Sequence, residues 1–220
     1  LLWELAGLPW VATIKLDGSS ATYVFDKEAQ EVFACSRNLR VKEYEGKPSP
    51  FIQVAIKYNL FEVLKQPEFQ DFAIQGELVG PGIQQNKLKL KEHDFKVFRI
   101  FNTVTKVPLL QSELEAMCVK LGLSFAPVVA TGDCFMPALK EYSDFCRDNN
   151  QEKDLEKVSL LNKEAIKELL ALAEGKYENT DNEQEGIVVR PRDSQLYSRK
   201  IKDWMSFKTI SNRFLLKEKD

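Results

Sequence analysis

The stretch TIKLDGSS, residues 13–20, decides how the rest of this chain is interpreted. It places Lys15 two residues before Asp17 and follows them with a glycine and two hydroxyls. Side chains alternate along a strand, so Lys15 and Asp17 would point the same way, about 7 Å apart. A lysine amine is a nucleophile when neutral, and burial or a nearby cation favours that form. Such an amine can attack carbon or phosphorus beside a carboxylate that holds an activating metal.

The same stretch has a plainer interpretation. Asp17-Gly18 between two alternating apolar runs is also typical of a hairpin turn. Lys15 would then be an ordinary solvated lysine. Only the remainder of the chain can decide between these two hypotheses.

Composition limits the class of protein. The chain has 220 residues, 44% hydrophobic and 29% charged, which is a globular balance for one domain, or one large and one small. A net charge of −2 argues against a purely electrostatic nucleic-acid binder, so any such surface must be a local patch. Four widely spaced cysteines without nearby histidines fit neither a zinc site nor a disulfide framework, and favour a reducing, intracellular compartment. We expect no membrane span.

Hydrophobic periodicity predicts an α+β fold with mainly antiparallel strands and helices clustered after Pro108. Strands are expected at 11–25 (two, joined at 17–19), 31–36, 72–79, 95–101 with an aromatic face inward, 185–190, and from 206 onward. Residues 87–91 alternate strictly between lysine and leucine. Helices are expected at 52–64, 112–121 (from a capping box at 112–115), 136–149, and 163–174 after an Asn162 cap.

Five further segments carry weak signals. Arg37 at a strand end suits a phosphate, although most such arginines lie on the surface. Glu77 inside an apolar strand needs an ion-pair partner, a ribose hydroxyl or a metal. Phe98 could stack on a base or simply fill the core. Glu185 repeats the pattern of a carboxylate beside a β-run, and Lys208 is a second lysine in a β-like run.

The order of these signals resembles that of the covalent nucleotidyltransferases, which are the DNA ligases, RNA ligases and mRNA capping enzymes. The likeness covers nearly the whole chain. It is closest to the ATP-dependent nick-sealing RNA ligases, in the branch with an OB-like module before the catalytic domain. The phrases that carry it are GELVGPGIQQN at 76–86, FRIFN at 98–102 and SFKTISN at 206–212.

The resemblance implies a nucleotidyltransferase (ATP-grasp-like) domain over residues 1–220, with a helical section at 112–175 inside it and the OB-like module upstream. It implies ATP and Mg²⁺ or Mn²⁺ as cofactors. Lys15 would attack the α-phosphorus of ATP and become lysyl-AMP. The other implied roles are metal arrangement, partly through waters, by Asp17, Glu77 and Glu185; adenine stacking by Phe98; ribose contact by Glu77; and phosphate contact by Arg37 and Lys208.

Two positions depart from the pattern. Many relatives have an adenine-reading glutamate directly before the nucleophile, where this chain has Ile14. Base recognition would then fall to backbone groups or to Thr13. Relatives often have a lysine where this chain has Ser206, and Lys200 or Lys202 would have to substitute for it.

The sequence therefore predicts an RNA ligase catalytic domain. It would transfer AMP to a 5′-phosphate and seal that end to a 3′-hydroxyl, at nicks in RNA-containing duplexes, as a monomer. Two alternatives stay open: a GTP-using capping guanylyltransferase, and a non-catalytic nucleotide- or RNA-binding module. The expected RNA-facing cations are Arg37, Arg40, Lys42, Lys87, Lys89, Arg190 and Arg192.

Overall fold

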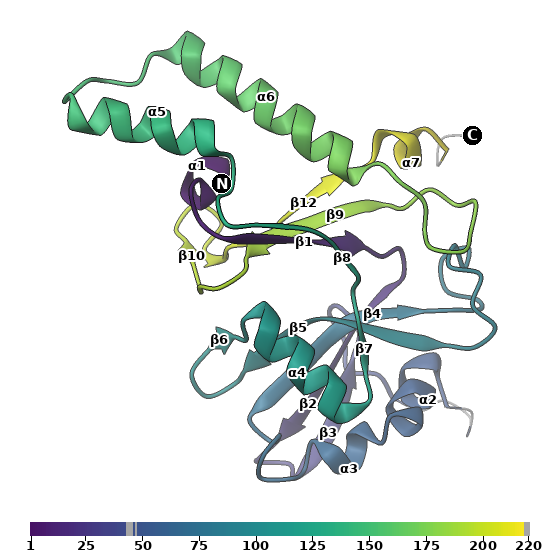
Figure 1. Cartoon of the computed structure of the whole chain (residues 1–220). Helices are drawn as coiled ribbons and strands as arrows, with labels where there is room; N and C mark the ends of the chain where they lie inside the picture. Colours follow the sequence, from purple (N-terminus) through teal and green to yellow (C-terminus); the bar gives the residue numbers. More distant parts are fainter. Residues whose placement is uncertain (43–45, 47, 218–220) are drawn as a thin grey trace. The chain divides into compact units, whose positions relative to one another are not determined.

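The computed structural model describes residues 1–42, 46 and 48–217 (Figure 1). The chain divides into two compact units. Unit 1 comprises Leu1–Lys15, Pro127–Lys176 and Glu183–Asp220, and unit 2 comprises Leu16–Ala126 and Tyr177–Asn182. The boundary therefore falls directly after Lys15. The four cysteines are free thiols, and no helix among the described residues is long and apolar enough to cross a membrane.

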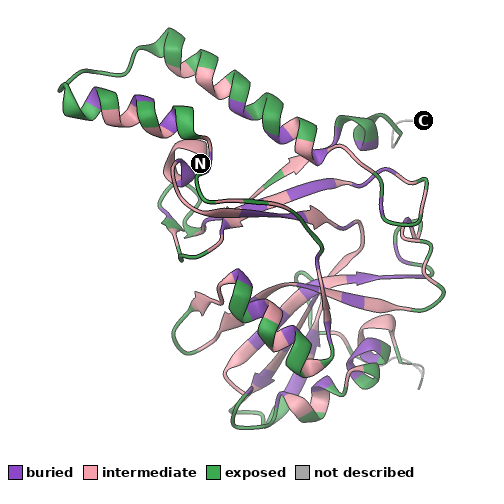
Figure 2. Cartoon of the chain, in the orientation of Figure 1, coloured by how far each residue is buried: buried purple, intermediate pink, exposed green. Residues whose placement is uncertain are grey.

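Unit 1 is built on an antiparallel four-stranded sheet in the order β12-β9-β1-β8. One face packs against apolar residues of α6, among them Leu169 and Ala173, and the buried positions of α6 recur along its length (Figure 2). Its elements are α1 (Leu2–Leu5), β1 (Trp10–Lys15), β8 (Val128–Gly132), α5 (Pro137–Asp148), α6 (Leu155–Ala173), β9 (Gly186–Pro191), β10 (Tyr197–Ser198), β11 (Asp203–Trp204), β12 (Phe207–Ile210) and α7 (Asn212–Lys217).

Unit 2 is built on a second sheet in the order β3-β2-β4-β5-β6, with β7 pairing in parallel to β5. Its core lies on the face that carries Tyr23, Ile74 and Leu78, under α2 to α4. Its elements are β2 (Ser19–Asp26), β3 (Glu31–Cys35), α2 (Pro50–Lys57), α3 (Leu60–Val63), β4 (Phe72–Val79), β5 (Asp94–Asn102), β6 (Val107–Pro108), α4 (Gln111–Leu121) and β7 (Ser124–Phe125).

This architecture confirms the predicted α+β class with mainly antiparallel strands. It also rejects the hairpin interpretation of residues 17–19. β1 pairs with β8 and β9, whereas β2 pairs with β3 and β4, so the two strands belong to different sheets. Asp17 and Gly18 connect one sheet to the other instead of turning back on β1.

Several predicted elements differ from the structure. The helix expected at 52–64 is two short helices, because Asn59 between them adopts the left-handed conformation. The last long helix begins at Leu155 rather than at 163, since Asp154 is its cap and accepts from the Lys157 N–H at 2.8 Å. Residues 87–91, which alternate between lysine and leucine, form no strand. The expected helical section 112–175 is divided, with α4 in unit 2 and α5 and α6 in unit 1.

Candidate active site

The register of the unit 1 sheet gathers several predicted residues on one face. Thr13 lies opposite Val188, and Val188 lies opposite Lys208 on the next strand. Directly opposed residues share a face, and so do residues two apart on a strand. Thr13, Lys15 and Lys208 therefore share the face opposite the one that carries the core residues Ala12, Ile187 and Val189.

Lys15 forms a close ion pair on this sheet. Its Nζ lies 2.6 Å from Oε2 of Glu185, with the two side chains 23% and 17% exposed. Glu185 directly precedes β9, and its position is fixed because its carbonyl accepts from the Ser211 N–H at 2.9 Å. Gly186 is required beside it, because φ is +148° and an added Cβ would lie 2.0 Å from the Thr209 carbonyl oxygen. The backbone around Gly186 thus fixes Glu185 where its carboxylate pairs with the candidate nucleophile, Lys15.

Thr13 and Ile14 stand directly before the lysine. Thr13 is buried, and its Oγ1 has no hydrogen-bond partner among the described residues. A buried hydroxyl without a partner costs free energy, which makes Thr13 an open polar position next to Lys15. The Ile14 side chain offers no polar atom, and its backbone N–H donates to the Pro127 carbonyl at 2.8 Å.

In unit 2, the Asp17-Gly18 part of the motif packs against β4. Gly18 lies so close to this strand that an added Cβ would be 2.4 Å from the Leu78 carbonyl oxygen and 2.8 Å from Cγ of Glu77. Only glycine permits this approach. Ser20, Glu77 and Lys96 lie in one row across the sheet and share the face opposite the core. The glycine therefore seats the Asp17 segment beside Glu77.

Asp17 has partners that the sequence did not reveal. Its Oδ2 lies 3.0 Å from Nζ of Lys87, and its backbone N–H donates to Oη of Tyr177 at 3.1 Å. Lys87 was predicted to face RNA, but its side chain is only 10% exposed. Neither Tyr177 nor Asn182, which binds the Lys87 carbonyl at 2.6 Å, carried any signal in the sequence.

Phe98 occupies a β-bulge. The ladder between β4 and β5 pairs Gln75 with Arg99 and Gly76 with Val97, so the register passes over Phe98. A bulge re-aims a side chain and interrupts alternation. Phe95 is consequently buried, whereas Phe98 and Phe101 are half-buried, so the expected inward aromatic face is only partly formed.

Comparison with known proteins identifies the family of this chain. The family model described as RNA ligase matches residues 8–209. The chain belongs to the RNA ligase family. No curated protein sequence matches it. Among solved structures, the chain is similar to Naegleria gruberi RNA ligase with PPi, at 25% identity and a TM-score of 0.72, covering 100% of this chain and 54% of that one. A mutant of that ligase with ATP and Mn matches at 24% identity and a TM-score of 0.71, again with 100% and 54% covered. The chain thus spans about half the length of these ligases, 54%.

The cations expected to contact phosphate or RNA in this RNA ligase family member differ in their pairing. Arg37 and Lys208 are exposed, and neither forms an ion pair within the described ranges. By contrast, three of the cations expected to face RNA are paired: Arg40 with Glu31 at 2.8 Å, Arg192 with Asp133 and Asp193 at 2.8 Å, and Lys87 with Asp17 at 3.0 Å. Lys200 and Lys202 lie in the turn between β10 and β11 and not on β12, which carries Lys208. Ser206 directly precedes β12.

The carboxylates expected to arrange a metal are divided between the units, with Glu185 in unit 1 and Asp17 and Glu77 in unit 2. Within the described part of either unit, no three acidic, histidine or cysteine side chains group closely enough to hold a metal ion. Their donor chemistry nevertheless fits one, because Mg²⁺ prefers carboxylates and keeps several waters. Glu185 and Asp17 each already hold a cationic amine, at 2.6 Å and 3.0 Å.

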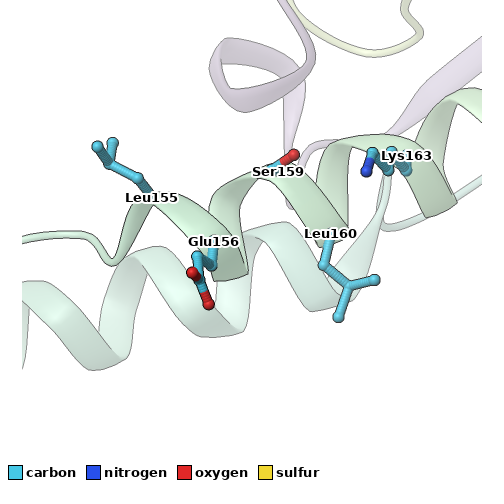
Figure 3. A pocket seen from close by; sticks show the side chains of 5 residues that line it. All are labelled: Leu155, Glu156, Ser159, Leu160 and Lys163. Carbon is cyan, nitrogen blue, oxygen red and sulfur yellow. The ribbon is translucent and has the colours of Figure 1, made fainter.

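A pocket lies on α6 (Figure 3). Its lining comes from that single helix, and Leu155 and Leu160 project away from the helix. The lining contains none of the predicted site residues.

Proposed function

We propose that this chain is the adenylyltransferase domain of an ATP-dependent RNA ligase, with Lys15 as its nucleophile. The observation that carries the proposal is the Lys15–Glu185 pair of 2.6 Å on the sheet face opposite the core. A half-buried lysine in a close ion pair differs from an ordinary solvated surface lysine. Membership of the RNA ligase family supports the same reaction.

The first step forms lysyl-AMP. The Lys15 amine attacks the α-phosphorus of ATP, a P–N bond forms, the bond between the α-phosphorus and its bridging oxygen breaks, and pyrophosphate leaves with the electron pair. Oε2 of Glu185 lies within hydrogen-bond distance of Nζ and can take the proton that the ammonium must lose. The AMP then passes to a 5′-phosphate, and a 3′-hydroxyl displaces it to join the strands.

A divalent cation would be held by Asp17, Glu77 and Glu185, in part through its waters. When bound, it neutralises charge on the α-phosphate and favours the neutral amine. Solved relatives were obtained with ATP and Mn and with AMP and Mn, which supports this cofactor choice. Within unit 1 the protein holds Lys15 against Glu185, and within unit 2 it holds Asp17 on the segment beside Glu77.

The remaining roles are assigned by chemistry and exposure. Phe98, re-aimed by its bulge, would stack on adenine. Arg37 and Lys208, both exposed, would contact phosphate oxygens. The buried Thr13 hydroxyl without a partner would take over base recognition that Ile14 cannot provide. The natural substrate is proposed to be a nick in an RNA-containing duplex.

Two assays on the same chain test this function. With α-labelled ATP and Mg²⁺ or Mn²⁺, we expect a covalent label that survives denaturing electrophoresis, and none with labelled GTP. With a nicked RNA duplex whose 5′-phosphate already carries AMP, we expect sealing without ATP. Label from GTP alone would overturn the ATP assignment in favour of a capping enzyme. Failure of both assays would overturn the proposal and leave a binding module.

A further inference from the structure

Lys87 is a buried cation outside the expected motif series. It is 9% exposed, and its Nζ lies 3.0 Å from Oδ2 of Asp17. Lysines are almost never buried unless they are paired, because desolvation of the ammonium is costly. The contact with Asp17 therefore offsets the cost of desolvating the Lys87 ammonium. An ion pair on the surface carries no such cost.

Further contacts hold both ends of this pair. Asn182 donates from Nδ2 to the Lys87 carbonyl at 2.6 Å, and Tyr177, which is 3% exposed, accepts from the Asp17 N–H at 3.1 Å. The Tyr177 N–H donates to the Asn182 carbonyl at 3.0 Å, which closes the segment on itself. Gln84 adds a contact from Nε2 to the Gly18 carbonyl at 3.4 Å. The 82–87 loop and the Tyr177–Asn182 segment thus contact Asp17 and Gly18, which directly follow the Lys15 segment.

We propose that Lys87 is the positioning residue that sets the orientation of the Asp17 carboxylate, with Tyr177 and Asn182 as its supports. The inference rests on the proposed function, which gives Asp17 its role in arranging the metal. A carboxylate on a connecting segment is otherwise free to rotate about its Cα–Cβ bond. Partners that orient metal-arranging ligands typically change metal affinity or activity by about 10–100-fold when removed.

The test is an activity cycle on Lys87→Met, Asp17→Asn and the double variant, measuring lysyl-AMP formation against Mn²⁺ concentration. We expect Lys87→Met to lower the rate about 10–100-fold with little change in KM for ATP. We expect Lys87→Arg, which keeps the charge, to retain more of the rate. Because Lys87 acts through Asp17, the double variant should match Asp17→Asn within about twofold. Lys91→Met, an exposed lysine of the same loop, is the control and should behave as the native chain.

Multiplicative effects of the two substitutions, or a native rate for Lys87→Met, would overturn the proposal. Unfolding of the same variants in metal-free buffer supplies a readout independent of turnover. There, the two single substitutions should each destabilise the chain, and the double variant should be less destabilised than their sum. If the native chain fails both assays of the proposed function, that function is overturned, whereas the Lys87–Asp17 coupling is still decided by unfolding.

A different surface carries an independent inference. β10 and β11 form a hairpin anchored at its base, where Ser198 Oγ donates to Oε2 of Glu4 at 2.9 Å and the Met205 N–H donates to the Leu196 carbonyl at 2.6 Å. Tyr197 is 52% exposed and packs edge-to-face on Trp204, with ring centroids 5.7 Å apart. The hairpin thus presents a fixed aromatic ring to solvent.

The tip of this hairpin is basic. Arg199, Lys200 and Lys202 are all exposed, and none forms an ion pair with a carboxylate in the part of the chain that the structure describes. Many other exposed cations do, for example Arg40 and Arg147. Aromatic rings beside such cations are the elements with which proteins bind single-stranded nucleic acid. We infer that this hairpin binds a single-stranded RNA segment, an inference that rests on the proposed RNA ligase function.

Anisotropy of a labelled 5′-phosphorylated single-stranded RNA 12-mer, titrated at several salt concentrations, tests the hairpin. We expect Tyr197→Ala to weaken binding about 5–100-fold, Tyr197→Phe to retain it, and Lys200→Gln with Lys202→Gln to flatten the salt slope by about 1.4. The control is Lys163→Gln with Lys167→Gln on α6, which removes the same charge elsewhere. Equal losses in both double variants, or an unchanged slope at the hairpin, would refute the site. Lysyl-AMP formation by Tyr197→Ala should be unaffected, which separates failure of the hairpin proposal from failure of the proposed function.

Discussion

Lys15→Ala is expected to abolish the covalent AMP adduct. The methyl group of alanine cannot attack phosphorus, and removing the nucleophile of a covalent enzyme lowers the rate by on the order of 10⁴-fold or more. Lys15→Arg should be equally inactive although it keeps the positive charge, because a guanidinium does not lose its proton in proteins. The measurement is denaturing electrophoresis after incubation with α-labelled ATP, followed by mass spectrometry of the peptide that carries residue 15.

Folding must be controlled separately, because Lys15→Ala leaves the Glu185 carboxylate, 17% exposed, without its close partner. Such a loss destabilises a protein by about 1–3 kcal/mol. The arginine variant preserves the charge and serves as the better-folded inactive form. Lys167→Ala on the exposed side of α6 is the matched control and should label like the native chain. Label that persists in Lys15→Ala would place the nucleophile elsewhere.

The strands of this fold could be predicted because their signals are local. Alternation located β3 and β4 closely, and glycine at 122 correctly ended α4 in the left-handed conformation. Strand pairing depends on residues far apart in the sequence. The same Asp-Gly signal therefore suits either a tight turn or a connection between two sheets. The N-terminal cap of α6, Asp154, was missed because Asn162 is also of a residue type that often caps helices. The side chain of Asn162 instead accepts from Nε1 of Trp3 at 2.9 Å.

In the candidate site too, the sequence indicated some residues and missed others. Ordered motifs identified Lys15 and Glu185, and the antiparallel register then placed them in contact. Lys87 was misassigned, because an alternating run of lysines and leucines gives no sign that one amine is buried. Asn182, which binds the Lys87 carbonyl, and Tyr177, which binds the Asp17 N–H, lie about 90 residues further along the chain. Contacts at such separations are set by tertiary packing and leave no periodic trace in the sequence.

Glu185→Gln is expected to lower lysyl-AMP formation by on the order of 10²–10³-fold. The amide keeps the shape of the side chain but loses the charge that holds the Lys15 ammonium at 2.6 Å and that would help arrange the metal. Because glutamine cannot take up a proton at this position, the amine also loses its adjacent acceptor. The measurement is the single-turnover rate of labelling at saturating ATP, with Mn²⁺ varied.

The matched control for this prediction is Glu178→Gln, which removes the same charge from an exposed position seven residues earlier. It should leave the rate unchanged. Glu185→Asp retains the charge on a side chain one methylene shorter, so its rate should fall between those of the native chain and Glu185→Gln. A rate for Glu185→Gln within a few-fold of native would mean that the 2.6 Å pair is only structural. The carboxylates of Asp17 and Glu77 would then have to arrange the metal without Glu185, and the role assigned to Glu185 in the reaction would be lost.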